Sequence, residues 1–323
     1  MSDLLKFYFS PHQLLSSVRR FVEGWLSVAG AELTVRELLS YWNIEECIRK
    51  VLQDTHFIWL LYLLPFMIGF FRFVPKHKVG ATIAGTDIRI SCKVCDILRQ
   101  QGDIVISVNT TFDTSTTDDF ISPQSLQGAF QTKYYGKGAS NVSTLDNEIS
   151  DALKSLKPVE IIKDGRKTKT KQYAVGTVVK LPKKKRFWSS SFRPYLVAMA
   201  TSTISGAATT TKEQFAEALQ KLWSFLAENG CKTKLCVPLL GTGRSGLNCA
   251  RMTIAKELIF SFVAYARSFR VVDELQICIT PHDCVTYNIS LDELQDYLNV
   301  VSANDSLYHK SSQTTNSSTP ISE

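Results

Sequence analysis

The sequence predicts an α/β domain with a mostly parallel or mixed sheet, preceded by an N-terminal helical region containing a transmembrane helix. Three observations support this: strand and helix patterns alternate from about residue 78 to residue 300, a fifteen-residue run at 57–71 carries no charge, and apolar residues before it recur at helical spacing. The 323 residues, 44% hydrophobic and 21% charged, are enough to bury a large core. This composition excludes wholesale disorder, a collagen-like repeat and a small disulfide-stapled scaffold.

Residues 1–54 form the expected N-terminal helical region. One amphipathic helix is indicated around Leu14–Leu26 and a second over Thr34–Leu52, because apolar residues recur there at intervals of three and four. Charged residues interrupt both stretches, so neither is expected to span a membrane. The pattern allows helices on the membrane surface, helices that pack with other copies of the chain, or a small soluble bundle.

The uncharged run from Phe57 to Phe71 predicts a transmembrane helix over residues 55–75. Nineteen residues of this segment would form a helix about 28 Å long, close to the roughly 30 Å hydrocarbon core of a bilayer. Trp59 and Tyr62 lie near one end and Arg72 at the other, as aromatic and basic side chains do at a membrane interface. A buried core helix is the alternative. Basic residues directly after the run favour a cytoplasmic location for the rest of the chain.

The segment from about residue 78 to residue 300 is expected to alternate strands and helices. The expected strands are Thr86–Val94, Ile104–Val108, Ala174–Leu181, Tyr195–Thr201, Leu235–Pro238 and Leu275–Thr280. The expected helices are Pro123–Tyr135, Leu145–Leu156, Thr211–Asn229, Ala250–Arg267 and Leu291–Val300. Residues 302–323 are rich in Ser, Thr and Asn, which predicts a disordered tail.

The eight cysteines are spread thinly along the chain. Cys92 and Cys95 form the one close pair, and no second Cys-x-x-Cys or His-x-x-x-His completes a set of zinc ligands. We therefore expect reduced thiols in a cytosolic setting, with no metal and no cofactor.

The positive charge is concentrated in one segment. The chain carries 37 Lys and Arg against 30 Asp and Glu, a net charge of +7, and ten of the cations lie with one acid between Lys163 and Arg186. Such a segment could follow the phosphates of a nucleic acid or approach anionic lipid headgroups. Because aromatic residues are nearly absent before Phe187, base stacking is poorly supported and a solvated hairpin is the preferred interpretation.

Two loops have the composition of phosphate-binding loops. The sharper one follows the strand Leu235–Pro238, where three glycines over residues 241–246 let the backbone approach a ligand and form an anion-binding nest. It lacks the Gly-Lys-Ser/Thr of a Walker A loop and the glycine spacing of a dinucleotide fingerprint, so an ordinary turn is the alternative. The second is Ser122–Gly128, where Ser122 and Pro123 are expected as the N-cap and first residue of a helix whose amino end favours phosphate.

With two further segments, these loops resemble the macro domain, a three-layer α/β/α module that binds ADP-ribose. The segments are Cys95–Ile97, similar to an early Gly-Asp-Ile; Val108–Phe112, similar to Val-Asn-Ala-Ala-Asn; Leu126–Phe130, similar to Val-Ala-Gly-Ala-Ile; and Pro238–Gly246, similar to Pro-x-x-Ser-Thr-Gly-x-x-Gly. The resemblance implies a macro domain over residues 78–300. Matched loops in the same order are far more specific than any single loop.

More narrowly, three segments resemble the ThsA-type effectors of Thoeris antiphage defence: Asn109–Asp113, Ile121–Gly128 and Leu240–Arg244. The membrane-anchored branch of that family places such a domain after an N-terminal hydrophobic region. A two-span hairpin would be usual there, and this chain has one convincing span.

This resemblance implies a protein of the bacterial inner membrane with its macro domain in the cytoplasm. A TIR-domain partner that cleaves NAD would supply the ligand, an ADP-ribose derivative, with a histidine conjugate as the expected signal. Binding would favour a homo-oligomer whose clustered N-terminal segments damage the lipid membrane. Nucleic acid is not expected as a partner.

The resemblance also implies the ligand-binding residues. The Asp96 carboxylate would hold the adenine amino group with a contact from the Ile97 N–H, the two loops would cradle the diphosphate, and Asn109–Asp113 would face the distal ribose. The full expected set is Asp96, Ile97, Asn109, Thr110, Thr111, Gln124, Ser125, Leu126, Gln127, Gly128, Leu240, Gly241, Thr242, Gly243, Arg244, Ser245, Gly246, Leu247 and Asn248. Arg244 could neutralise phosphate charge or face solvent.

Phe112 bears on catalysis. The second Asn of the macro motif positions substrate in many ADP-ribosyl hydrolases, and Phe112 stands at that position. Asp113 and Asp118 are nearby, but lone loop carboxylates are usually solvated surface, and catalysis would need a group that activates water. We expect a binding pocket without catalytic residues. The alternatives are an ADP-ribosyl hydrolase and a nucleic-acid or lipid-binding protein that acts through residues 163–186.

Overall fold

The computed structural model describes most of the chain. The described residues are 6–41, 63, 66–68, 70, 76–115, 121–136, 139–162, 169–185, 190–202, 208–230, 232–243 and 247–303. The chain divides into two compact units, Met1–His77 and Lys78–Glu323. The predicted tail lies almost wholly outside the described residues.

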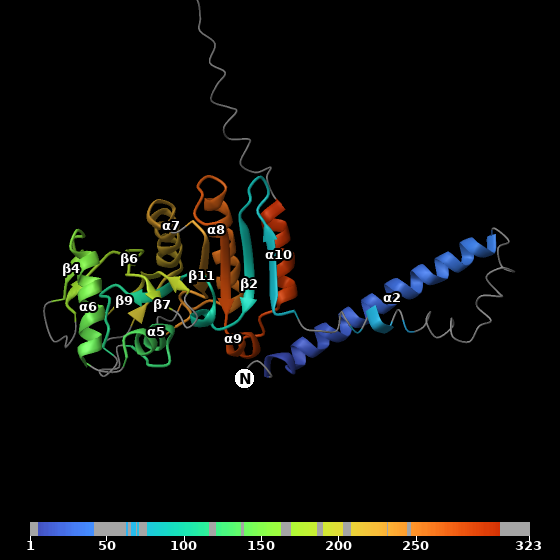
Figure 1. The fold of residues 1–323 in the computed structure, drawn as a ribbon, viewed down its shortest axis with the longest axis horizontal. Helices are drawn as coiled ribbons and strands as arrows, with labels where there is room; N and C mark the ends of the chain where they lie inside the picture. Colours follow the sequence, from blue (N-terminus) through green and yellow to red (C-terminus); the bar gives the residue numbers. More distant parts are fainter. Residues whose placement is uncertain are drawn as a thin grey trace, which may run out of the picture. The chain divides into compact units, whose positions relative to one another are not determined.

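The N-terminal unit contains one long helix, α2 (Pro11–Tyr41; Figure 1). Two separate helices were predicted, around Leu14–Leu26 and over Thr34–Leu52. The structure instead has one helix that continues through Gly30 as far as Tyr41, so the predicted break is wrong. A single glycine costs only about 1 kcal/mol in a helix interior, which the surrounding helix-forming residues offset. Apolar side chains of α2 such as Leu15 and Leu26 are exposed.

The predicted transmembrane helix over residues 55–75 lies largely outside the described residues. Within the parts of the chain that are described, no helix is both long enough and apolar enough to cross a membrane.

The second unit is built on an eight-stranded mixed sheet. Its main path runs β1 (Lys78–Thr82), β2 (Arg89–Val94), β12 (Glu274–Ile279), β11 (Lys234–Pro238), β3 (Asp103–Asn109), β9 (Pro194–Ser202) and β10 (Ala208–Thr209). The five strands from β2 to β9 are parallel, whereas β1 and β10 are antiparallel to their neighbours and β6 (Val178–Lys180) pairs antiparallel with β9. The predicted mixed sheet is confirmed.

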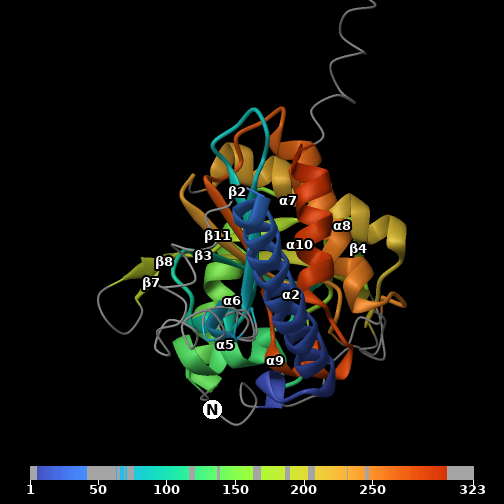
Figure 2. The same cartoon turned by 90° about the vertical axis from the view of Figure 1, so that its right-hand side faces the viewer.

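Helices cover the sheet. On one side, α7 (Lys212–Asn229) packs on β9 and β6, α10 (Leu291–Ala303) packs on β1 and β2, and α8 (Arg251–Ala266) contacts both helices (Figures 1 and 2). On the other side, α5 (Leu126–Tyr134) contacts β3, and α6 (Ala139–Leu153) contacts β6. These layers bury the apolar stripes of the helices against both faces of the sheet.

Short elements complete the unit. The 3-10 helix η1 (Ile97–Arg99) follows β2, and α9 (Pro281–Thr286) follows β12. Two small hairpins lie outside the sheet. They are formed by β4 (Glu160–Ile161) with β5 (Lys171–Gln172), and by β7 (Lys184–Lys185) with β8 (Ser191–Phe192).

The predicted start of α5 is wrong. The helix begins at Leu126 with Ser125 as its N-cap, whose hydroxyl accepts a hydrogen bond from the Gly128 N–H (3.1 Å). Ser122 and Pro123 instead form a turn before the helix, in which the Ser125 N–H donates to the Ser122 carbonyl (3.0 Å). The signal of Ser followed by Pro marked the turn rather than the helix itself.

Candidate functional site

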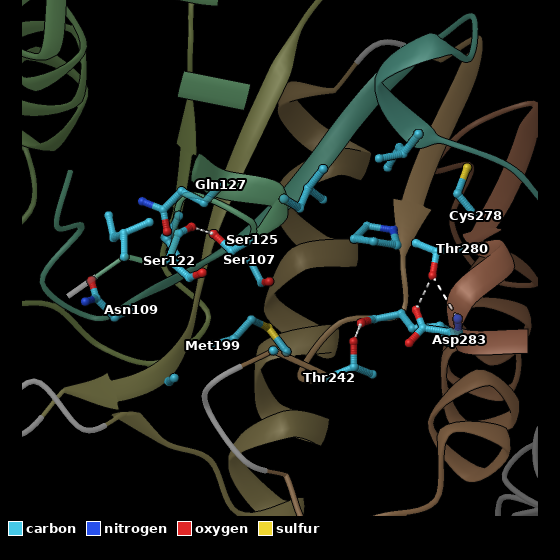
Figure 3. Close-up of a pocket in the computed structure, with 18 of the residues that line it drawn as sticks. Ser107, Asn109, Ser122, Ser125, Gln127, Met199, Thr242, Cys278, Thr280 and Asp283 are labelled. Atoms are coloured by element: carbon cyan, nitrogen blue, oxygen red, sulfur yellow. Dashed lines mark hydrogen bonds between the residues drawn. The ribbon is translucent and has the colours of Figure 1, made fainter. Parts of the chain in front are cut away.

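A cleft of about 320 Å³ lies where the parallel strands end (Figure 3). Its described lining comes from segments at the carboxyl ends of β2, β3, β9, β11 and β12, and from the start of α5. The lining residues are Cys95, Ile97, Ser107, Val108, Asn109, Ile121, Ser122, Ser125, Leu126, Gln127, Met199, Ala200, Pro238, Leu239, Thr242, Gly243, Cys278, Thr280 and Asp283. Ligands of open α/β sheets bind in this position.

The first phosphate-type loop is fixed by close packing. A Cβ atom added at Gly128 would overlap the Ser122 carbonyl oxygen and would lie 2.8 Å from the Cα of Pro123, so only glycine fits there. The N–H groups of Leu126 and Gln127 belong to the first turn of α5, which has no preceding helical carbonyls to accept from them. These donors and the positive end of the helix dipole favour an anion in the cleft.

The segment after β3 folds around a buried carboxylate. One Asp113 oxygen, Oδ2, accepts hydrogen bonds from Asn109 Nδ2 and from Thr111 Oγ1, both at 2.7 Å. The Asp113 N–H donates to Asn109 Oδ1 (3.0 Å), and Gln127 Nε2 donates to the Asp113 carbonyl (2.7 Å). Asp113 is fully buried, so the expectation of a solvated surface carboxylate is wrong. Asp118 lies outside the described residues.

Lys169 also holds the segment after β3 in place. Lys169 Nζ donates to the Phe112 carbonyl (2.7 Å) and forms an ion pair with Asp146 (2.6 Å). Phe112 is completely buried, has a positive φ of 52° and packs edge-on against Tyr173. Its side chain belongs to the core. Within Asn109–Asp113, Asn109 is the residue that lines the cleft.

The second loop turns sharply after β11. Gly241 has a φ of 73°, in the left-handed region that favours glycine, and Thr242 Oγ1 donates to the Leu239 carbonyl (2.6 Å). Gly243 faces open space. The expected ligand residues Arg244–Gly246 lie outside the described residues.

The opposite end of the cleft carries thiols and a carboxylate. Cys95 and Cys278 line it, and the hydrogen bond between their thiols lowers the pKa of Cys95. Asp283 also lines the cleft and accepts a hydrogen bond from Thr280 Oγ1 (2.8 Å) through Oδ2 (Figure 3). It is the one charged side chain in the described lining.

Asp96 stands at this end without lining the cleft. Its Oδ1 accepts from the Leu98 N–H (2.9 Å), which caps η1, and its Oδ2 lies 3.3 Å from Arg99 Nε. Its neighbours Cys95 and Ile97 do line the cleft.

The structure thus brings together part of the expected set. Seven expected residues line the cleft: Ile97, Asn109, Ser125, Leu126, Gln127, Thr242 and Gly243. Among the described remainder, the residues outside the lining are Asp96, Thr110, Thr111, Gln124, Gly128, Leu240, Gly241, Leu247 and Asn248. Thr110, Thr111 and Leu240 are buried, and Gly128 shapes the first loop from behind.

Sequence reasoning missed the β12 end of the site, Cys278, Thr280 and Asp283. The helix that carries Asp283 has only six residues, too few for a periodic pattern. Its start did carry a signal, because Thr280 is the N-cap and Pro281 the first helical residue.

Comparisons with known proteins agree on the family. Residues 90–280 match the family model described as Thoeris protein ThsA, Macro domain. The chain is 24% identical over 185 residues to Thoeris protein ThsA of Bacillus amyloliquefaciens (strain Y2), covering 57% of this chain and 58% of that protein. It therefore spans less than two thirds of the length of this curated relative.

Solved structures of a macrodomain are similar at low identity. A point mutant of the Oceanobacillus iheyensis macrodomain is 12% identical, with a TM-score of 0.45 over 69% of this chain and 94% of that chain. The same macrodomain with MES bound is 14% identical, with a TM-score of 0.43 over 68% and 97%. Since the family match covers more than half of the sequence, the chain belongs to the ThsA macro domain family of Thoeris proteins.

Proposed function

We propose that this chain is a Thoeris effector whose macro domain binds an ADP-ribose-derived signal, with histidine-ADP-ribose as the expected ligand. A TIR-domain protein that cleaves NAD is the proposed source of that signal. The proposal rests on family membership and on one structural observation: a cleft at the carboxyl edge of the sheet that is lined by the start of α5 and by the loop after β11.

The cleft offers different chemistry along its length. At one end, the first turn of α5 and the loop after β11 supply donors suited to a diphosphate. At the other end, the Ile97 segment and Asp283 supply a backbone donor and a carboxylate acceptor, which suit the edge of an adenine base. Asn109 then faces the distal ribose and its conjugate.

We propose a sensor without catalytic activity. Hydrolysis needs a group that places or activates water at the distal ribose. Asp113, the nearest carboxylate on this segment, is buried, and its Oδ2 already accepts from Asn109 and Thr111. This arrangement supports a structural role for Asp113.

The proposal extends to the membrane. The apolar segment 55–75 is the proposed anchor in the inner membrane, and the exposed apolar side chains of α2 are available for contacts between copies. Ligand binding would favour an oligomer that disrupts the membrane, which requires the ligand to bind the assembled state more tightly than the resting one.

The test is calorimetric titration of the full chain in detergent with ADP-ribose and with its histidine conjugate. Tight binding is expected, with preference for the conjugate, and it should weaken in Gln127→Ala. Lys157→Ala, which changes an exposed residue outside the cleft lining, should bind as the wild type does. Absence of binding to either ligand would overturn the proposed ligand class.

Assembly provides a second test. Light scattering of the same preparation should show larger particles only after the conjugate is added. Assembly of equal extent without ligand would contradict the proposed coupling, even if the ligand binds.

A further inference from the structure

A second cavity, of about 490 Å³, lies at the other edge of the same sheet. Its described lining comes from the amino ends of β3, β9 and β11 and from the ends of β6 and α7. The lining residues are Gln101, Gly102, Asp103, Lys180, Lys183, Ser191, Arg193, Gly230, Thr233 and Lys234. Its volume falls in the range of roughly 300–1,000 Å³ typical of small-molecule sites.

The cavity is strongly basic. Four cations and one carboxylate line it, whereas Asp283 is the one charged side chain in the described lining of the cleft at the carboxyl edge. The single carboxylate, Asp103, is already used: its Oδ1 accepts from the backbone N–H of Arg193 at 2.8 Å. This bond fixes the start of β9, and the single negative charge of Asp103 can balance only one of the four cations.

Two of the cations have partners that account for them. Lys180 Nζ donates to the Asn229 carbonyl (2.6 Å) at the end of α7, where cations are favourable. Lys234 Nζ binds Glu274 (3.0 Å) and Gln276 (2.8 Å). These contacts occupy both ammonium groups.

Arg193 and Lys183 are not accounted for in this way. The Nε atom of Arg193 is buried and has no hydrogen-bond partner among the described residues. Lys183 is exposed, and no ion pair among the described residues includes it. Neither side chain is therefore balanced by a described carboxylate, and both line the cavity.

We infer that this cavity is a second ligand site, which binds a small molecule carrying two or more phosphate groups. A planar guanidinium and a flexible ammonium together suit phosphate oxygens, the first by a fork of donors and the second as a point charge. This inference is independent of the proposed ADP-ribose site. The phosphates could belong to a free metabolite or to the headgroup of an anionic lipid, and the chemistry of recognition is the same.

The test uses the full chain in detergent and inorganic pyrophosphate as the probe, measured by calorimetry. Wild-type protein should bind, and Arg193→Lys and Lys183→Gln should each weaken binding by about tenfold, the effect of one charge-assisted hydrogen bond. Lys157→Gln is the matched control, because it removes an exposed lysine outside the cavity and should change nothing. Thermal unfolding of each variant verifies that the fold is intact.

Two results would overturn the inference. The first is a wild-type protein that binds no pyrophosphate. The second is binding that both cavity variants retain in full, because the probe would then occupy another site such as the carboxyl-edge cleft. Lys183→Gln keeps the test valid if Arg193→Lys unfolds, because Lys183 is exposed.

A second arm identifies the source of the phosphate. The full chain is placed in vesicles of phosphatidylcholine alone or with phosphatidylglycerol, and pyrophosphate binding is compared. The wild-type protein could bind pyrophosphate more weakly in the anionic vesicles than in the neutral ones, with no such difference for Arg193→Lys. That result would assign the cavity to a lipid headgroup. Equal binding in both would assign it to a free phosphate compound.

Discussion

The two edges of the sheet differ in how they can hold an anion. At the carboxyl edge, the described lining has one charged side chain, Asp283, and the proposed donors are backbone N–H groups of a helix start and a glycine-containing loop. At the amino edge, four cationic side chains line the cavity, and the proposed donors are those of Lys183 and Arg193. Backbone donors are fixed by the fold and cost little to order, whereas side-chain donors bring charge but must be held in place.

This difference predicts that the carboxyl edge is sensitive to shape and the amino edge to charge. Damage to the first should follow from small changes of backbone packing. Damage to the second should follow from removal of charge or from added salt.

The largest effect is expected from Gly128→Ala. The new Cβ would overlap backbone atoms of Ser122 and Pro123, which cannot move as a flexible side chain would. Overpacking of this kind costs about 1–3 kcal/mol and should lower the melting temperature by several degrees. The displaced loop should also weaken ADP-ribose binding by at least about tenfold.

The matched control is Gly243→Ala, at a position with open space around the added atom. Its melting temperature should equal that of the wild type. A Gly128→Ala protein that is as stable and binds as tightly as the wild type would show that the loop packing at the carboxyl edge does not shape the site.

Asp113→Ala should have the next largest effect. It removes the acceptor of Asn109 Nδ2 and Thr111 Oγ1, and leaving buried donors unsatisfied costs about 1–3 kcal/mol. Chemical denaturation should show this loss, together with weaker ADP-ribose binding, because Asn109 loses its orientation. Asp151→Ala, which removes an exposed carboxylate on α6, should leave both unchanged. Full stability of Asp113→Ala would mean that the segment is held by other contacts.

Added salt should weaken ligand binding at the two edges to different extents, an effect smaller than that of either substitution above. Raising the ionic strength to about 0.5 M screens exposed charges, so pyrophosphate binding at the amino edge should weaken several-fold. ADP-ribose binding, which relies mainly on backbone donors, should change less. Titration of both ligands at low and high salt measures the difference, and a steeper salt dependence for ADP-ribose would reverse the comparison.

Much of the fold could be predicted from the sequence, because the buried strands and the apolar stripe of α7 follow the periodicities of their elements. Six predicted strands and five predicted helices correspond to β2, β3, β6, β9, β11 and β12 and to α5, α6, α7, α8 and α10. The short hairpins and β1 were not predicted, since two to five residues carry too little pattern. The ends of α5 and β6 were misplaced because turn residues near an element do not fix its first residue.

The candidate site could be predicted only in part. Its loops were found because glycines and a helix start leave a trace in the sequence. The burial of Asp113 could not be found, since it depends on Asn109 and Gln127, which reach it through the fold. The basic cavity was missed for the same reason: Lys234 is far from the basic segment 163–186 in sequence and meets Lys180 and Arg193 only at the sheet edge.

Asp283→Asn should have the smallest effect and tests which carboxylate recognises the base. Asp283 lines the cleft, and its Oδ2 is held by Thr280, whereas Asp96 caps η1 through Oδ1 and lies beside Arg99 through Oδ2. An uncommitted carboxylate oxygen would accept from the exocyclic amino group of adenine, a hydrogen bond worth about 0.5–1.5 kcal/mol. Asp283→Asn should therefore reduce the preference for ADP-ribose over its hypoxanthine analogue by a few-fold, with stability unchanged. If only Asp96→Asn reduces that preference, Asp96 turns into the cleft when the ligand binds, and the carboxyl edge is less preorganised than its packing indicates.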